Sequence, residues 1–465
     1  MPRTTTTPPA TRTAQPRPSI DPAARRASAA ATAEVLRQMQ APGWRLTLVD
    51  SPPGAGKTTL VGSVADDRLH GGDHNIPIVT QTNAQADDLT RTLSARFTGS
   101  NRTIGRLHAS DYAAPADLSA DPSVVCSKDI GALTGCSVVV APAKKWAFVD
   151  AGSWTWPYGI VDEVYQMRSD GLLEVADLFD GLLAVGDPGQ LNPWTSGDES
   201  LVRGYDGTPL ASAAHTLLRS HPTTAVVTLP TSWRLAPSAA AVISEAFYTQ
   251  PFTAASMPGA RALQLRLPGR DSIDTALTHA AQTGWTLLEL PEAHMPTGDP
   301  RAVDALVELV TRTLTGGATC RDERGRIYPI AAEHLAVGVA HRAQRDAVRY
   351  ALAPVLTGLG LEPDAVAVDT ANRLQGREFE IVFAWHPMSG RRDATAFHIE
   401  AGRLCVLLSR HRQACVLVTR GGLRRQLETF PQPDKLWLGE HQPTVSGWEA
   451  NLTVLDHLQP HLIRA

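Results

Sequence analysis

The chain has 465 residues, of which 43% are hydrophobic and 19% are charged. A chain of this length typically forms two or three domains, and this composition excludes a wholly disordered protein. The formal net charge is −4. This excludes a histone-like protein that binds nucleic acid through bulk charge, but it leaves room for a local basic channel.

Cysteine usage and hydropathy indicate where the protein works. The five cysteines form no CxxC pair, which argues against a disulfide framework or a zinc module and favours a reducing compartment. No uninterrupted apolar run approaches the roughly 18–20 residues that a membrane span needs. We therefore expect a cytoplasmic protein with no membrane partner.

The N-terminal segment is rich in Thr, Pro, Ala and Arg, with five arginines against one acid within residues 1–30. This composition predicts a disordered basic tail over residues 1–30, with a phosphate-binding arm or an organelle transit peptide as the alternatives. The segment lacks the apolar region of a secretory signal. A helix is predicted over residues 30–39, ended by Pro42 and Gly43.

Short β-rich runs then alternate with helical stretches, and each run is followed by Gly, Pro, Asn or Asp. This βαβ pattern predicts an α/β fold with mostly parallel sheets in two domains, residues 31–225 and 226–465. A small insert is expected at about 95–130, and an insertion or linking region at about 250–330. The predicted strands are 45–49, 76–80, 137–140, 159–161, 182–185 and 225–229, then 335–340, 365–368, 381–385 and 414–418.

A phosphate-binding loop directly follows the first predicted strand, in the sequence SPPGAGKT from Ser51 to Thr58. Glycines in such a loop let backbone N–H groups wrap the phosphates, Lys57 reaches the β- and γ-phosphates, and the Thr58 hydroxyl ligates Mg²⁺. Ser51 stands where the pattern has its first glycine, at a position that mainly sets the turn. The predicted nucleotide contacts are Pro53, Gly54, Ala55, Gly56, Lys57, Thr58 and Thr59.

Two adjacent acids end the predicted strand 159–161. Two such acids on their own are usually a solvated strand end. A phosphate loop about 100 residues upstream favours catalysis instead, with Asp162 near Mg²⁺ and Glu163 as the general base for the attacking water.

Further motifs follow in a fixed order, at predicted strand ends. They are QTNA (81–84), GDPGQL (186–191), SWRLAP (232–237), VGVAHRAQ (337–344), DTANRLQGRE (369–378) and RLCVLLSRHR (403–412). Together with the phosphate loop, they resemble a superfamily 1 helicase of the branch typified by the nonsense-mediated-decay helicase and its DNA-acting relatives. The resemblance runs from about residue 30 to about residue 425.

The resemblance implies two tandem RecA-like P-loop NTPase domains with mostly parallel sheets and with ATP in the cleft between them. Gln190 would sense the γ-phosphate. Arg234 and Arg410 would reach from the far side of the cleft as arginine fingers, which suits the planar fork of arginine; a surface salt bridge is the alternative for each. The other implied nucleotide contacts are Gln375, Gly376 and Glu378, with Glu378 on the ribose.

Nucleic acid contacts are expected in both domains. Thr82, Asn83 and Thr370 lie where the family touches the nucleic acid backbone. A basic and aromatic cluster, Lys144-Lys145-Trp146, follows the strand CSVVVAP and offers charge and stacking. Core packing is the alternative for this tryptophan and for Trp154, Trp156 and Trp194. Helical spacing over residues 445–462 predicts a helix packed on its own domain, with partner docking as the alternative.

Two functions compete. The first is an ATP-driven helicase or translocase that uses Mg²⁺, acts as a monomer and moves on single-stranded nucleic acid, with DNA favoured over RNA. The direction 5′ to 3′ follows from the resemblance alone. The alternative is an ATP-gated clamp or switch that does not unwind, which the short inserts favour; either could take its specificity from a protein partner. A metabolite kinase explains the phosphate loop but not Gln190, Arg234 or Arg410. Neither Gln15 nor Gln38 has the spacing of an adenine-reading glutamine.

Overall fold

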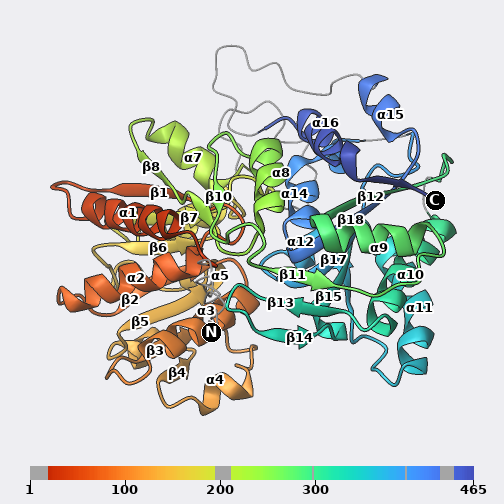
Figure 1. Ribbon diagram of the computed structural model, residues 1–465. Coiled ribbons are helices and arrows are strands. Elements are labelled where there is room, and N and C mark those ends of the chain that lie inside the picture. The colour runs from red at the N-terminus through yellow and green to blue at the C-terminus, as the bar shows by residue number, and fades with distance from the viewer. Residues whose placement is uncertain (1–18, 194–210, 296–297, 393–394, 430–444) are drawn as a thin grey trace, which may run out of the picture.

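The structure is a computed structural model that describes residues 19–193, 211–295, 298–392, 395–429 and 445–465. Two sheets dominate this part of the chain and lie side by side (Figure 1). The first is built from the N-terminal half and the second from the C-terminal half. The predicted α/β fold with two mostly parallel sheets is confirmed.

The first sheet has eight strands in the order β4-β3-β5-β2-β6-β7-β1-β8, and every neighbouring pair is parallel. Strands of such a sheet are buried on both faces, which is why they read as apolar runs. The strands are β1 (Leu46–Asp50), β2 (Ile76–Thr80), β3 (Ile104–Leu107), β4 (Val124–Ser127), β5 (Val138–Pro142), β6 (Gly159–Asp162), β7 (Leu182–Gly186) and β8 (Ala225–Thr228).

Helices cover both faces of the first sheet. Val35, Leu60 and Leu93 of α1, α2 and α3 pack on one face, and Trp146 and Leu172 of α5 and α6 pack on the other. Because all strands of this sheet are parallel, the loops that leave their carboxyl ends meet at one edge. The helices are α1 (Pro22–Met39), α2 (Lys57–His70), α3 (Asn83–Phe97), α4 (Ala116–Ala120), η1 (Ile130–Leu133), α5 (Ala143–Trp146), α6 (Ser169–Ala176) and α7 (Ala213–Ser220).

The second sheet has six parallel strands in the order β16-β15-β17-β18-β12-β19. These strands are β12 (Trp285–Leu290), β15 (Leu335–Val339), β16 (Ala367–Thr370), β17 (Phe379–Trp385), β18 (His411–Arg420) and β19 (Leu462–Arg464). Buried side chains of α8, α14 and α16 cover one face, and those of α9, α10 and α11 cover the other.

The helices of this half are α8 (Pro237–Phe247), α9 (Ser272–Thr283), α10 (Pro300–Thr315), η3 (Ala332–His334), α11 (Arg342–Gly358), α12 (Ala371–Leu374), α13 (Ala396–Ile399), α14 (Ala401–Leu408), α15 (Leu423–Thr429), α16 (Gly447–Leu458) and η4 (Gln459–His461). Two small sheets lie beside them. One pairs β9 (Thr231–Ser232) with β10 (Thr253–Ala254), and the other is an antiparallel sheet of β11 (Ala262–Gln264), β13 (Thr319–Arg321) and β14 (Ile327–Pro329).

The boundary predicted between residues 225 and 226 is wrong. It falls inside β8, which pairs in parallel with β1 of the first sheet from Ala225 to Thr228. The chain crosses to the second half after this strand, because Leu235 and the buried face of α8 belong to the core of the second sheet.

Two segments predicted as inserts are parts of the main sheets. Residues 95–130 contribute β3 and β4, which extend the first sheet beyond β5. Residues 250–330 contribute β12, which lies between β18 and β19 in the second sheet. The Pro- and Gly-rich punctuation around Trp285–Leu290 marks turns between these elements and not an irregular region.

Helix α1 begins earlier than predicted. It starts at Pro22, inside the expected disordered tail, because the Asp21 side chain caps it by accepting a hydrogen bond from the N–H of Ala23 and because proline suits the first turn. At the other end of the chain, α16 packs on α8 and α14 (Figure 1), which confirms the helix packed on its own domain. Within the described ranges, no helix is long and apolar enough to cross a bilayer.

Candidate active site

The phosphate loop joins β1 to α2 and depends on two glycines. Gly54 and Gly56 have φ values of 71° and 90°, in the left-handed region that favours glycine. A Cβ on Gly54 would lie 2.3 Å from the Cβ of Arg234, so the loop and the arginine segment pack backbone against backbone. Ser51, in place of the first glycine, is not among the residues with positive φ, which explains why a side chain is tolerated there.

Lys57 forms ion pairs with both acids at the end of β6. Its Nζ lies 2.9 Å from Oδ1 of Asp162 and also contacts the carboxylate of Glu163. Burial acts to lower the pKa of Lys57, but the charges of Asp162 and then Glu163 outweigh it, so the pKa is raised and the amine stays charged. The sequence prediction that these three residues share a site agrees with this geometry.

The backbone of Glu163 is strained. Its φ is +60°, a conformation that costs a side-chain-bearing residue about 1–3 kcal/mol and that clusters at functional sites. The Asp162 carboxylate accepts the Glu163 N–H at 3.0 Å, and Gln166 donates to the Glu163 carboxylate at 2.8 Å. These contacts aim the carboxylate of Glu163 at Lys57.

A buried polar chain leads from the end of β7 to the second sheet. Asp187 accepts a hydrogen bond from the hydroxyl of Tyr248 at 2.6 Å, and Gln190 donates to its other oxygen. Gln375 of the second half donates to Oε1 of Gln190 at 2.7 Å. Burial raises the pKa of Asp187 to about 7, against the lowering effect of the Tyr248 hydrogen bond. Gln190 therefore couples the two halves directly.

Arg234 lies where the chain passes from the first half to the second, between β8 and Leu235 of the second core. Its segment follows β8 of the first sheet and rests on the phosphate loop, where the N–H of Trp233 donates to the carbonyl of Gly54 at 2.8 Å. The side chain then crosses to Glu378, which it pairs with at 3.0 Å. Arg234 therefore starts beside the phosphate loop, and its side chain reaches Glu378 of the second half.

Arg410 is enclosed. It is 1% exposed, and its guanidinium donates to the carbonyl of Val406 at 3.1 Å and to the Ser409 hydroxyl at 2.8 Å. Burial, and then the positive charge of Arg234, lowers the pKa of Arg410 to about 10. Both arginines contact Ser409, since the Nη1 of Arg234 donates to its carbonyl at 3.5 Å.

Glu378, the predicted ribose contact, is held by two arginines. It accepts from Arg234 and, at 3.2 Å, from Arg412. Burial acts to raise the pKa of Glu378, but the charge and hydrogen bond of Arg234, and then those of Arg412, outweigh it and lower the pKa. Gly376 precedes it with φ +82°, so the chain turns sharply between Gln375 and Glu378.

The predicted nucleic acid residues occupy three different environments. Thr82 caps α3 and is exposed, whereas the side chain of Asn83 accepts a hydrogen bond from Arg106 at 2.9 Å. Thr370 is half-buried at the carboxyl end of β16. Lys144 is exposed and Lys145 half-buried at the end of β5, next to the β2 end that leads to Thr82.

The prediction that Trp146 contacts nucleic acid is wrong. The side chain is fully buried and its Nε1 donates to the carbonyl of Ile78 at 3.1 Å, because the first turn of α5 turns this ring into the core. Trp156 packs edge-on against Trp146, with 5.5 Å between the ring centroids, and Trp154 stacks on Trp156. The alternative of core packing therefore applies to these three tryptophans. Trp194 lies outside the described residues.

Sequence reasoning missed two surfaces. Phe148 is 84% exposed, two residues after Trp146 and close to both lysines; following the helical turn past Trp146 would have indicated it. In the second half, a group of arginines from α11 and α12 surrounds the Asp369 carboxylate beside Thr370, within 3.3–3.9 Å. These arginines are Arg345, Arg349 and Arg373. The spacing of four residues between Arg345 and Arg349 on α11 was the available signal.

The residues around the phosphate loop fit a nucleotide with a divalent metal ion. Helix α2 begins at Lys57, and its N-cap Gly56 offers no side-chain cap, so the first N–H groups of its backbone suit a phosphate. A hydroxyl on Thr58 and a carboxylate on Asp162, which already contacts Lys57, are the oxygen ligands that Mg²⁺ prefers.

This geometry is that of a P-loop NTPase built from two RecA-like domains. Residues 211–421 match the protein family described as an AAA domain. Together with the order of the motifs, the match supports a superfamily 1 helicase. No curated protein matches the chain.

Solved helicase structures resemble the chain weakly. The Arterivirus nonstructural protein 10 helicase matches at 15% identity and a TM-score of 0.42, over 85% of this chain and 61% of that one. The PRRSV helicase matches at 16% identity and a TM-score of 0.39, over 90% of this chain and 58% of that one. The Arterivirus protein in complex with DNA matches at 14% identity and a TM-score of 0.40, over 85% of this chain and 63% of that one. The chain thus spans about three fifths of the length of these helicases.

Proposed function

We propose that the protein is an ATP-driven helicase or translocase that moves on single-stranded nucleic acid, with DNA favoured over RNA. One observation carries the proposal: groups from both halves converge on the phosphate loop. Lys57, Asp162 and Glu163 come from the first sheet, Arg234 crosses to Glu378, and Gln190 contacts Gln375 of the second half. A nucleotide bound there would touch both halves and could move one relative to the other.

The residues of the first half would perform the hydrolysis. The phosphates of ATP would draw Lys57 away from its two carboxylates and onto the β- and γ-phosphates. Thr58 and Asp162 would hold Mg²⁺, which when bound neutralises phosphate charge. Glu163 would accept the proton of the attacking water as the new bond to the γ-phosphorus forms and the bond to the bridging oxygen breaks.

The arginines would stabilise the charge that develops on the transferred phosphoryl group. Arg234 starts next to Gly54 and needs only to exchange Glu378 for the γ-phosphate, which frees Glu378 for the ribose. Arg410 is enclosed behind Ser409, so its use as a finger requires a rearrangement of the cleft. The half-exposed ring of Trp233 lies against the loop, with Cδ1 3.7 Å from the place of a Cβ on Gly56, and we propose it as the surface on which the base packs.

The nucleic acid would cross the carboxyl edges of both sheets. Thr82, Lys144 and Lys145 offer backbone and charge contacts in the first half, and Thr370 with its neighbouring arginines does so in the second. Opening and closing of the cleft would step the strand between the two halves, and we propose the direction 5′ to 3′ from the family resemblance.

Steady-state ATP hydrolysis tests the proposal. The rate is measured without nucleic acid, with single-stranded DNA and with single-stranded RNA. Glu163→Gln serves as the blank that should bind nucleotide without turnover, and Lys57→Ala as the variant that should lose both. Stimulation by one polymer, with both variants inactive, supports a nucleic acid motor. Hydrolysis that ignores both polymers contradicts it.

An ATP-gated clamp or switch is the second candidate, and one observation favours it. Residues 95–130 complete the first sheet as β3 and β4, so this segment does not form a separate strand-splitting insert. A forked duplex with a labelled strand separates the two functions. ATP-dependent strand release indicates a helicase, whereas polymer-stimulated hydrolysis with an intact duplex indicates a clamp or translocase.

A further inference from the structure

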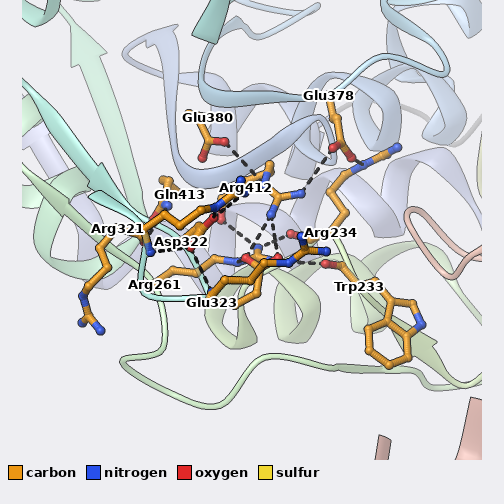
Figure 2. A network of polar contacts seen from close by, with 12 residues as sticks. Trp233, Arg234, Arg261, Arg321, Asp322, Glu323, Glu378, Glu380, Arg412 and Gln413 are labelled. Carbon is orange, nitrogen blue, oxygen red and sulfur yellow. Dashed lines mark hydrogen bonds and ion pairs between the residues drawn. The ribbon is translucent and has the colours of Figure 1, made fainter. Parts of the chain in front are cut away.

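A buried arginine outside the expected motifs holds the Arg234 segment. The side chain of Arg261, just before β11, is only 4% exposed. Its Nη2 donates to the carbonyl of Trp233 at 2.9 Å, and its Nη1 donates to the carbonyls of Arg234 and, at 3.2 Å, of Arg412 (Figure 2). One guanidinium therefore fastens two consecutive peptide groups of the segment that carries the proposed finger.

The carboxylate of Glu323 balances the charge of Arg261. The Nε of Arg261 pairs with it at 2.9 Å. Burial, and then the charge of Arg412, lowers the pKa of Arg261, against the attraction of Glu323. A buried charge beside a like charge is costly unless its hydrogen bonds are met. Only a planar fork with several N–H groups can serve a carboxylate and the neighbouring carbonyls together.

The network closes into a ring that includes the finger. Arg412 pairs with Glu323 at 3.0 Å and with Glu378 at 3.2 Å, and Glu378 pairs with Arg234 (Figure 2). Arg261 completes the ring through the Arg234 carbonyl. The small sheet of β11, β13 and β14 is thereby connected to the site, since Glu323 lies two residues after the end of β13.

The phosphate loop holds the segment that carries Arg234 from the side opposite to Arg261. The hydroxyl of Ser232 donates to the carbonyl of Pro53 at 2.6 Å, and the N–H of Trp233 donates to Gly54 at 2.8 Å. The backbone of Arg234 thus lies between the phosphate loop and the Arg261 guanidinium. Only its side chain is left to exchange one partner for another.

We propose that Arg261 is a positioning residue for Arg234: it fixes the backbone from which this arginine reaches the γ-phosphate, and Glu323 holds Arg261 in place. The inference rests on the proposed role of Arg234 in ATP hydrolysis. Misplacement of a catalytic group by about 1 Å costs on the order of 100-fold in rate. Loss of Arg261 should therefore lower turnover while nucleotide still binds.

The experiment uses the full chain and three single variants. Arg261→Gln removes the charge, and Arg261→Lys keeps the charge but loses the fork. Arg326→Gln is the matched control, because Arg326 pairs with Asp322 in the same small sheet while its side chain is 70% exposed. We expect kcat for ATP to fall by roughly tenfold or more in both Arg261 variants, with KM within about threefold and the control unchanged.

A double-variant cycle separates positioning from a general structural effect. In an Arg234→Ala background, Arg261→Gln should cost less than about twofold, because the residue acts through Arg234. A full additional loss in that background, or a single variant that keeps its kcat, overturns the inference. Affinity for ADP with aluminium fluoride, which mimics the transferring phosphate, should fall relative to ADP in Arg261→Gln; equal losses for both ligands overturn it as well.

A variant that does not fold and a chain that does not hydrolyse ATP are distinguished from a failure of the positioning role. If Arg261→Gln does not fold, Glu323→Gln replaces it, since this variant removes the carboxylate that holds Arg261 in place; unchanged kcat in it contradicts the inference. If the unmodified chain binds nucleotide but does not hydrolyse it, the proposed function fails. The comparison of ADP with and without aluminium fluoride then decides the positioning role by itself.

Discussion

At the scale of single residues, the site combines buried charge with backbone strain. Glu163 holds a left-handed backbone immediately after a strand, and Lys57 faces both acids. In this state the two carboxylates share one amine, which the phosphates of a nucleotide would attract away. Nucleotide binding would thus release the base at the moment when its substrate arrives.

Asp187 gives stability a pH dependence of defined sign. Its folded pKa of about 7 is raised above the ordinary value of 3.8, so the folded protein binds more protons between these values. Stability is therefore highest at low pH within this window and falls as pH rises through about 7, with a slope of up to roughly 1.4 kcal/mol per unit. Asp187→Asn should flatten this slope in urea unfolding at pH 5–8. Asp180→Asn, at an exposed position, should leave the slope unchanged.

Gly54 tests the contact between the phosphate loop and the Arg234 segment. Gly54→Ala would place a Cβ 2.3 Å from the Cβ of Arg234 and would also strain a φ of +71°. Gly72→Ala is the matched control, because its φ of +99° carries the same kind of strain with no atom within 4 Å. We expect Gly54→Ala to weaken ADP binding at least tenfold by calorimetry, whereas the control loses only about 1 kcal/mol of stability. Equal ADP affinity in both variants would contradict the close approach.

At the scale of elements, the segment after α5 presents a different aromatic residue, Phe148, from the one that the sequence indicated. If nucleic acid crosses the end of β5, Phe148 should stack on a base beside Lys144 and Lys145. Phe148→Ala should then weaken single-stranded DNA binding by about 1–3 kcal/mol in fluorescence anisotropy, and Phe148→Tyr should restore it. Leu173→Ala, an apolar side chain 71% exposed on α6, should have no effect. A loss that Tyr does not restore would indicate a structural role.

The sequence predicted the elements that carry strong local signals. The apolar run of β2 was predicted with its observed ends, Ile76–Thr80, and the phosphate loop lies where its pattern placed it. Strand β12 was missed because its neighbours are punctuated by Pro and Gly, and only pairing with β18 and β19 makes it a strand. Likewise, the burial of Trp146 depends on the direction in which α5 leaves β5, which no local pattern encodes.

The candidate site also contains residues that local patterns could predict and residues that only the tertiary fold brings together. The residues of the phosphate loop and the acid pair are local to strand ends, so their shared site could be expected. Arg261 and Glu323 could not, because they are 62 residues apart and meet only through the antiparallel pairing of β11 with β13. The place of Arg234 next to the phosphate loop also depends on β8 joining the first sheet.

At the scale of the whole molecule, the contact between Gln190 and Gln375 joins the two halves at the site. If this contact transmits the state of the nucleotide, Gln375→Ala should lower the stimulation of ATP hydrolysis by single-stranded nucleic acid more than it lowers the basal rate. The ratio of stimulated to basal rate measures the effect. Gln282→Ala, at an exposed position on α9, should behave as the unmodified protein. Equal loss of basal and stimulated rates would assign Gln375 to hydrolysis itself.

The strand order of the first sheet also has a consequence for synthesis on the ribosome. Strand β1, which carries the phosphate loop, lies between β7 and β8 and therefore waits for partners that end at Gly186 and Thr228. At about 5–20 residues per second, its apolar edge stays unpaired for roughly ten seconds or more after it emerges. A nascent chain arrested before Ala225 would expose β1 on one side, so chaperone binding should peak over this interval and decline once β8 has been made.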